Sequence, residues 1–538
     1  MTQLNSLLSP INELMVRKIP KYNWEQIDKF YGKKKTKSLI HYADKLKKTL
    51  GKKNIEIWTF NSATSGGGVA DLLDALLSLS KKHGINWHWF VIKGNSAFFN
   101  STKIFHNVLH GNKKIKITNQ ILKNYLQGTR SNVRGLQRVL LKSAHTEKIK
   151  IPDIVLVHDP QPLALFPLFK KYYPQLFKKY FAKTIFIWQS HIPFNLSSRS
   201  QLGRFLIKYI NFYRLAIYHR DNKLPKLKIP IFSKNVNSIN PLSYFNINLE
   251  NTRAGKEFIE ATLIKHNIKK YGTETQFILQ NSRFDHWKDQ IGVIKAFEKA
   301  FEILEKKGKQ IKLILIGPIA GDDIKESIEL LKKLKKIADE FNSEHKGKFI
   351  YIKPLFTKRE KLTQRYWKKF LAAGFNPDKL FPRLNRFQKK ALKKMHIKPQ
   401  CLTETNIHEL EINALQSFSN IIILKSLEEG QGLSAIGAKF KSKPVIVSAT
   451  GGLTAQIKDH FNGILVGLDP KTKKPITNPK KFRKLTIEQT TKAIIELINH
   501  PKLAKKLALS AHRDVVKNYI TPRQLMDYYQ IFILSATK

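Results

Sequence analysis

Both halves of this chain contain the same local pattern, in which an apolar strand is followed by a glycine-containing turn and then by an amphipathic helix. In the first half the pattern consists of residues 55–60, the triplet Gly66-Gly67-Gly68 and a leucine-rich stretch at 69–82. In the second half it consists of 421–424, a turn at 429–432 and the stretch 433–440. Strands that alternate with helices predict an α/β architecture with parallel sheets.

The remaining apolar runs extend this alternation along most of the chain. They predict further strands at 87–92, 154–157, 184–188, 277–280, 311–316, 349–352 and 444–448. A chain of 538 residues is long enough for two or three domains. We expect an N-terminal Rossmann-like domain at 1–245, a second at 246–515, and a C-terminal helix within 516–538 that packs back on the first domain.

Charge is the unusual feature of the composition. The chain has 96 Lys and Arg residues against 40 Asp and Glu, a formal net charge of +56. Such a surface attracts anions, so an acidic lipid, a nucleic acid or an acidic protein is a candidate partner. The alternative is a lysine-rich solvated surface with no partner. A hydrophobic content of 42% indicates a folded protein in either case.

The stretch 355–402 concentrates this charge, because its lysines and arginines are interleaved with aromatic residues such as Tyr366, Trp367 and Phe370. We interpret it as a helical insertion in the second domain. It is either a packed element with a solvated basic face or a contact site for an anionic partner.

Cysteine usage and hydropathy bear on the compartment. The single cysteine, Cys401, excludes an intramolecular disulfide and a zinc site built from several thiolates. Neither a signal-peptide core near the N-terminus nor a run of about 20 apolar residues is present. These features predict a cytoplasmic protein without a transmembrane segment, although unconventional export would leave no such trace.

The two glycine turns are candidate binding sites for a phosphate or a sugar hydroxyl. A turn between a strand and a helix presents free backbone N–H groups that can hold a phosphate or a sugar hydroxyl. Gly66, Gly67 and Gly68 form one candidate of this kind. The other consists of Gly430, Gln431, Gly432, Leu433 and Ser434, with Glu429 at its entrance as an acceptor for the hydroxyls of a polyol.

Charged and titratable residues also follow several predicted strands. Arg283 and Lys288 come directly after the strand at 277–280, at the edge where open α/β sheets bind ligands. An arginine and a lysine together suit a phosphate leaving group. His158, Asp159 and His191 lie at the ends of two strands in the first half.

Seven segments in order resemble the trehalose synthase and trehalose phosphorylase group of glycosyltransferases. They lie at 61–71, 98–111, 157–162, 188–192, 281–289, 413–416 and 425–452. The resemblance implies the GT-B fold, in which two Rossmann-like domains face each other across a cleft, and a retaining hexosyl transfer without a metal cofactor. It also implies that Arg283, Lys288, Glu429 and His158 are catalytic and that Asp159 and His191 face the sugar.

One position departs from the family pattern. A second Glu, which holds the ribose of the donor nucleotide, normally stands eight residues after the first, and here that position is Gly437. The donor is then a sugar phosphate without ribose, or another residue replaces the Glu, or the protein has changed its donor or lost activity. The glycine also offers room for a bulkier group.

These observations leave three functions open. The first is transfer of a hexosyl unit, glucose by resemblance, from a nucleotide-sugar to an acceptor sugar or another hydroxyl compound, as a trehalose synthase does. The second is a phosphorylase-like reaction that uses glucose 1-phosphate. The third is a catalytically reduced protein that binds an anionic partner through its basic surface.

Overall fold

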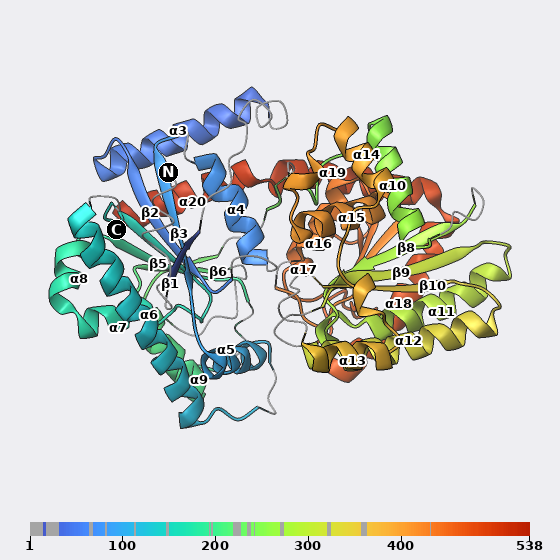
Figure 1. Ribbon diagram of the computed structural model, residues 1–538, viewed down its shortest axis with the longest axis horizontal. Helices are drawn as coiled ribbons and strands as arrows, with labels where there is room; N and C mark the ends of the chain where they lie inside the picture. The colour runs from blue at the N-terminus through green and yellow to red at the C-terminus, as the bar shows by residue number, and fades with distance from the viewer. Residues whose placement is uncertain are drawn as a thin grey trace. The chain divides into compact units, whose positions relative to one another are not determined.

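The structure is a computed structural model in which the chain divides into two compact units, shown in Figure 1. Unit 1 comprises residues 1–238 and 520–538, and unit 2 comprises 239–519. The residues that the structure describes are 14–17, 32–63, 68–80, 83–111, 115–146, 150–192, 194, 197–218, 227–233, 238–240, 243–268, 274–319, 324–356, 363–430 and 432–537.

Unit 1 is built on a seven-stranded sheet with the strand order β1-β3-β2-β4-β5-β6-β7. The strands are β1 (Leu14–Arg17), β2 (Ile55–Asn61), β3 (Ile85–Ile92), β4 (Ile154–His158), β5 (Ile185–Ser190), β6 (Leu215–Tyr218) and β7 (Ile231–Ser233). All neighbours are parallel except β1, which pairs antiparallel with β3 at the edge. The sequence analysis did not predict β1, β6 or β7, because strands of three or four residues have little periodicity to recognise.

Helices cover both faces of this sheet. They are α3 (Lys33–Leu50), α4 (Gly68–Ser80), α5 (Ser96–Leu109), α6 (Asn119–Thr146), α7 (Leu165–Tyr172), α8 (Pro174–Phe181), α9 (Gln201–Ile210) and α20 (Thr521–Thr537). Helices α5 to α9 share one aromatic-rich core with the sheet. The C-terminal helix α20 packs against α3 and α4, and the Tyr528 hydroxyl donates a 2.6 Å hydrogen bond to Gln189 on β5.

Unit 2 has a fully parallel six-stranded sheet with the order β10-β9-β8-β11-β12-β13. Its strands are β8 (Gln276–Asn281), β9 (Ile311–Pro318), β10 (Ile350–Leu355), β11 (Ile421–Leu424), β12 (Val445–Ser448) and β13 (Ile464–Val466). The order reverses between β8 and β11, and the crevice at such a switch point is where open parallel sheets bind ligands.

The helices of unit 2 form two apolar cores, one on each face of the sheet. They are α10 (Arg253–Lys265), α11 (Gln290–Glu305), α12 (Ile324–Glu344), α13 (Gln364–Ala372), α14 (Arg386–Lys394), α15 (Glu404–Phe418), α16 (Leu433–Phe440), α17 (Leu453–Gln456), α18 (Pro479–Asn499) and α19 (Pro501–Asn518). Helix α18 begins at Pro479. Proline suits the first turn of a helix, and Asn478 caps it.

The described part of the stretch 355–402 contains the two helices α13 and α14. Phe370 of α13 is buried in the same core as α11 and α12, and Leu392 of α14 is buried against α10 and α15. Its aromatic and leucine side chains therefore anchor it to both faces of unit 2, while most of its cations stay exposed.

Candidate functional site

The turn after β8 places Arg283 and Lys288 at the carboxyl edge of the unit 2 sheet. Buried amides hold its backbone: Gln280 donates a 2.7 Å hydrogen bond to the carbonyl of Lys288, and Gln290 donates one of 2.7 Å to the carbonyl of Arg283. The Asp285 carboxylate accepts from the backbone N–H of Trp287 at 3.0 Å and caps the short helix η2 (His286–Lys288). The two cations are thus presented by a rigid turn.

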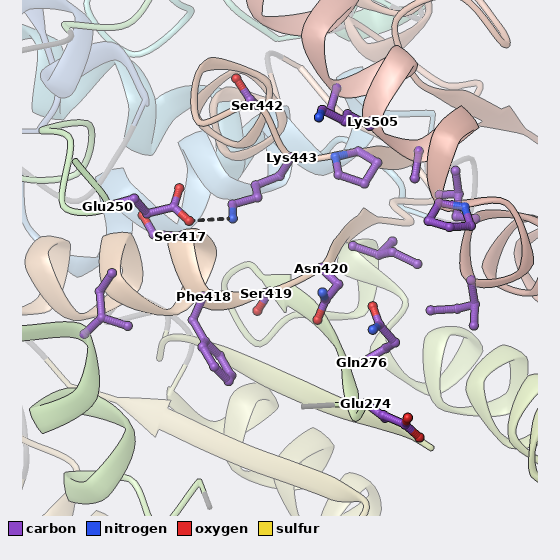
Figure 2. Close-up of a pocket in the computed structure, with 18 of the residues that line it drawn as sticks. Glu250, Glu274, Gln276, Ser417, Phe418, Ser419, Asn420, Ser442, Lys443 and Lys505 are labelled. Atoms are coloured by element: carbon purple, nitrogen blue, oxygen red, sulfur yellow. Dashed lines mark hydrogen bonds and ion pairs between the residues drawn. The ribbon is translucent and has the colours of Figure 1, made fainter. Parts of the chain in front are cut away.

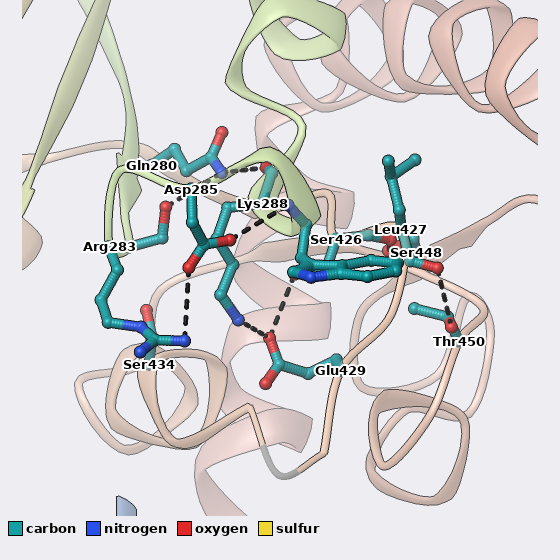
Figure 3. A network of polar contacts seen from close by, with 12 residues as sticks. Gln280, Arg283, Asp285, Lys288, Ser426, Leu427, Glu429, Ser434, Ser448 and Thr450 are labelled. Atoms are coloured by element: carbon teal, nitrogen blue, oxygen red, sulfur yellow. Dashed lines mark hydrogen bonds and ion pairs between the residues drawn. The ribbon is translucent and has the colours of Figure 1, made fainter. Parts of the chain in front are cut away.

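Lys288 forms an ion pair with Glu429, as Figure 3 shows. The Lys288 Nζ lies 2.5 Å from Glu429 Oε2, and the Ser426 hydroxyl donates to the same oxygen at 3.0 Å. Burial alone would raise the pKa of Glu429, but the ammonium of Lys288 and the Ser426 hydroxyl outweigh it, so the pKa lies below its usual value. Glu429 is therefore a carboxylate at neutral pH. The structure brings together two residues that are 141 positions apart.

Arg283 stands at the more open end of this cluster. Its guanidinium lies 3.3 Å from Asp285, and its side chain is 52% exposed, against 14% for Lys288. The positive charge of Arg283 also contributes to the lowered pKa of Glu429, which places the two side chains in one electrostatic neighbourhood. Arg283 is the cation of this site that solvent and ligands reach most easily.

A second ion pair, which the sequence analysis missed, lies beneath the first. Lys425, with a side chain only 1% exposed, pairs with Asp289. Burial lowers the pKa of Lys425, and Asp289 offsets part of that effect. The backbone N–H of Leu427 also donates a 2.7 Å bond to the carbonyl of Trp287 and joins the two loops directly. Asp289 ends the segment 281–289 and Lys425 begins the segment 425–452, so their place in two of the family-like segments was the available signal.

The start of α16 provides the second wall of the unit 2 site. Gly432 caps the helix with φ +66°, and a Cβ there would lie 2.5 Å from Leu453, so glycine is required on both counts. The Ser434 hydroxyl donates to the carbonyl of Asn281 at 2.9 Å and ties α16 to the end of β8. Gly430 and Leu433 lie at this same turn, and Gln431 lies outside the described residues.

Gly437 does not open a space, contrary to one of the explanations offered for it. A Cβ at this position would lie 2.5 Å from the Phe245 ring and 3.2 Å from the Oδ1 of Asn246. The ammonium of Lys441 sits 4.6 Å from the centre of the same ring and donates to Gln416 at 2.9 Å. Burial lowers the pKa of Lys441 to about 7. The space that the side chain of the family's second Glu would enter is therefore occupied by the ring of Phe245, which also contacts the Lys441 ammonium.

In unit 1 the carboxyl edge of the sheet carries a pair of histidines. His158 ends β4, and its Nδ1 lies 2.8 Å from the Nε2 of His191, which follows β5. The other ring nitrogen of His158 lies 2.9 Å from the Thr59 hydroxyl of β2. Burial lowers the pKa of His158 to about 3, so the ring is neutral at pH 7. Three neighbouring strands thus contribute to one hydrogen-bonded chain, in which His158 is neutral.

Asp159 follows with a left-handed backbone, at φ +64°. Its Oδ1 accepts a 2.7 Å hydrogen bond from the backbone N–H of His191, and its carbonyl accepts from the indole of Trp188 at 3.0 Å. Burial raises the pKa of Asp159 to about 7 even though the N–H of His191 opposes the shift. A strained, perturbed residue beside paired histidines is typical of a functional site.

Of the glycine turn predicted in unit 1, only its last member falls within the described residues. Gly68 is the first residue of α4. Gly66 and Gly67 lie outside the described residues, so their assignment to donor or phosphate binding stays a prediction.

A large cavity of about 1490 Å³ lies elsewhere in unit 2, at the amino ends of the strands (Figure 2). Several of its polar groups have structural partners. Lys443 pairs with Glu250 at 3.0 Å, Asn420 accepts from the backbone of Phe277, and Thr252 caps α10. Ligands of parallel sheets bind at the opposite, carboxyl edge, which is where the charged cluster lies.

Comparison with known proteins agrees with this geometry. The family model "Trehalose synthase, N-terminal domain" matches residues 59–225, and the model "Glycosyl transferases group 1" matches 370–473. The trehalose synthase of Pyrococcus horikoshii is 27% identical over 94% of this chain and 95% of its own length. The chain is thus similar to trehalose synthases along nearly its whole length, and its two units have the GT-B glycosyltransferase fold.

More distant proteins set the limits of this similarity. A solved trehalose 6-phosphate synthase from Burkholderia multivorans superposes with a TM-score of 0.58 at 13% identity, over 90% of this chain and 99% of its own, which shows a shared fold. The trehalose phosphorylase of Grifola frondosa is 26% identical over 56% of this chain and 42% of its own length. Because the glycosyltransferase model begins at residue 370, much of the predicted insertion at 355–402 belongs to the family domain.

Within the described part of the chain, no helix has both the length and the apolar character needed to cross a bilayer. The cytoplasmic location and the absence of a metal cofactor stay predictions of the sequence.

Proposed function

We propose that this glycosyltransferase moves a glucosyl unit from a nucleotide-sugar to a hydroxyl acceptor with retention of anomeric configuration, and that trehalose is the default product. The observation that carries the proposal is the ion pair between Lys288 and Glu429 at the start of α16, with Arg283 beside it. The similarity to trehalose synthases along nearly the whole chain supports the choice of sugar and product.

The unit 2 cluster suits the charges of a departing phosphate. Arg283 is open to a ligand and offers two parallel N–H donors, while Lys288 supplies a point charge. Both groups stabilise the negative charge that develops on the leaving oxygen. The backbone N–H groups of Leu433 and Ser434 at the start of α16 add a positive helix terminus.

Glu429 is assigned to the donor sugar. Both of its side-chain hydrogen bonds, from Lys288 and from Ser426, end on Oε2. Its Oε1 is therefore the oxygen that we assign to a sugar hydroxyl. Because Lys288 contacts Glu429 directly, binding of the phosphate by Lys288 and binding of the sugar by Glu429 are coupled through one ion pair.

The unit 1 histidines are assigned to the acceptor. A neutral His158 hydrogen-bonded to His191 and Thr59 orients a hydroxyl group without adding charge to the site. The pKa of Asp159 is about 7, so its carboxyl group is partly protonated at neutral pH. We assign to it the role of donating a hydrogen bond to the acceptor hydroxyl or accepting one from it.

A sugar 1-phosphate donor is a second candidate, and one observation favours it. The ring of Phe245 occupies the space beside Gly437, so α16 presents no carboxylate for ribose hydroxyls at that turn. Loss of one charged hydrogen bond lowers nucleotide affinity by about 1–3 kcal/mol, which a diphosphate contact can offset. The nucleotide-sugar stays our first choice, because the phosphorylase similarity covers much less of the chain than the synthase similarity does.

Product analysis with a panel of donors tests both candidates. Nucleoside diphosphate glucoses and glucose 1-phosphate are each incubated with glucose, and proton NMR of the product reports the anomeric configuration. We expect nucleotide release, an α-configured product and a loss of kcat of at least about a hundredfold in Arg283→Ala. The matched control is Arg365→Ala, because Arg365 is an exposed arginine on α13 of the same unit.

Each alternative has its own outcome. Turnover of glucose 1-phosphate alone, with phosphate release and no use of nucleotide-sugars, would assign the phosphorylase-like reaction. An inverted product would refute retention. No turnover of any donor would leave the catalytically reduced protein as the remaining function.

A further inference from the structure

The helices on one side of unit 1 lack acidic residues. Helices α5, α6, α7, α8 and α9 contain no Asp or Glu. Between residues 95 and 238 the chain has 25 Lys and Arg against four acidic residues, Glu147, Asp153, Asp159 and Asp221. None of those four lies in a described helix. A general excess of lysine does not explain this, since it adds cations without removing carboxylates from one region.

Exposed cations line up on this side of the unit. Arg130 and Arg134 lie one turn apart on the solvent side of α6, and the doublets Lys170-Lys171 and Lys178-Lys179 lie at the ends of α7 and α8. We call these six residues the cationic face. In Figure 1, α6, α7 and α8 lie side by side in unit 1, and contacts join α6 to α7 and α7 to α8.

Aromatic rings connect the cations into one surface. Arg130 lies 5.5 Å from the centre of the Tyr172 ring and donates to its hydroxyl at 2.8 Å, and Lys171 lies 5.9 Å from the same ring. Lys170 lies 5.5 Å from the centre of Phe177, which joins α7 to α8. Tyr172 is 38% exposed. The face therefore presents tyrosine edges and ammonium groups together.

Helix α12 of unit 2 balances its charge differently. Lys335 pairs with Asp339 at 2.7 Å, and Lys336 pairs with Glu340 at 3.8 Å. Helix α12 alone carries several acidic residues among its lysines. The long-range field around α12 is accordingly reduced, whereas no carboxylate of a described helix on the same side of unit 1 reduces that of the cationic face.

We propose that the cationic face docks unit 1 on a membrane surface that contains acidic phospholipids. Clusters of four to eight Lys and Arg on amphipathic helices are attracted to such a surface, and tyrosine prefers the lipid–water interface. The alternative anion is a single-stranded nucleic acid, which binds by stacking its bases on open aromatic faces. Here Arg130, Lys170 and Lys171 already cover those ring faces.

Co-sedimentation of the full-length protein with vesicles tests the proposal. We expect binding to phosphatidylcholine vesicles that contain phosphatidylglycerol, no binding to pure phosphatidylcholine, and a steep loss of binding as salt rises. Replacing Lys170, Lys171, Lys178 and Lys179 by Gln lowers the affinity by roughly tenfold or more. These side chains are exposed, so the variant keeps its melting temperature.

A matched control separates this face from general charge. Lys325, Lys332, Lys333 and Lys336 of α12 are also exposed, and replacing them by Gln removes the same four charges. The proposal requires the control to bind vesicles like the wild type. Equal losses in both variants would overturn it, as would a wild type that does not bind acidic vesicles.

A second variant and a second ligand close the remaining possibilities. Arg130→Gln/Arg134→Gln tests the α6 part of the face independently and is expected to weaken vesicle binding about threefold or more. Tight binding of a single-stranded oligonucleotide, lost in the four-lysine variant and without vesicle binding, would replace the lipid by a nucleic acid. None of these results depends on the transfer activity.

Discussion

The carboxyl edges of the two sheets differ in how their buried polar side chains are partnered. In unit 2 the edge holds full charges in compensating pairs, Lys288 with Glu429 and Lys425 with Asp289. In unit 1 the edge holds a hydrogen-bonded chain of Thr59, His158 and His191, in which His158 is neutral. The difference is the one expected from the two roles that we propose, because a leaving phosphate requires fixed positive charge and an acceptor hydroxyl requires orientation.

The largest effect is expected from breaking the charged pair in unit 2. Glu429→Gln leaves the Lys288 ammonium buried without its counter-ion, which destabilises unit 2 by about 3 kcal/mol and abolishes transfer. The double variant Lys288→Met/Glu429→Gln recovers most of the stability but none of the activity, because it removes both charges. Urea unfolding and the product assay measure the two properties separately. A double variant no more stable than the single one would show that the pair has no compensating role.

The second prediction concerns how the stability of unit 1 depends on pH through His158 and Asp159. The pKa of His158 is lowered, so its contribution to stability is present above pH 6.5 and is lost as pH falls toward 3. The pKa of Asp159 is raised, so its contribution is present below pH 3.8 and is lost as pH rises through 7. The two slopes oppose each other between pH 3.8 and 6.5.

Asp159→Asn removes one of these slopes and keeps a residue that tolerates the left-handed backbone. Relative to the wild type, the variant should lose up to about 1.4 kcal/mol per pH unit as pH falls from 7 toward 4. Free energies of unfolding measured in urea at a series of pH values check this. A difference between the two proteins that does not change with pH would contradict a protonated Asp159.

The smallest effect is expected from Thr59 in unit 1. Thr59→Val keeps the shape of the side chain and leaves the Nε2 of His158 without its partner, at a cost of about 1–2 kcal/mol. Thr59→Ser, which retains the hydroxyl, is the control. Activity is expected to fall less than tenfold in Thr59→Val, because His191 still fixes the ring. Equal stability of the Val and Ser variants would show that the Thr59 hydroxyl contributes no hydrogen bond to His158.

Much of the fold followed from local pattern. Predicted strands such as 55–60, 154–157 and 421–424 lie within one or two residues of β2, β4 and β11, and the predicted helix at 433–440 coincides with α16. These elements are buried and strongly periodic, so burial and period agree. Short edge strands such as β1 were not predicted, because they become strands by pairing with a neighbour and not through their own composition.

The sequence by itself determined which residues stand at the ends of strands: Arg283, Lys288 and Glu429 in unit 2, and His158, Asp159 and His191 in unit 1. A parallel sheet brings all of its carboxyl ends to one edge, so their gathering follows from order alone. Only the tertiary structure decided their chemical states. Lys288 forms an ion pair with Glu429, which is 141 residues away in the sequence. Burial keeps His158 neutral, and the ring of Phe245 occupies the space beside Gly437. Contacts between distant segments set local dielectric and charge, and no local pattern records them.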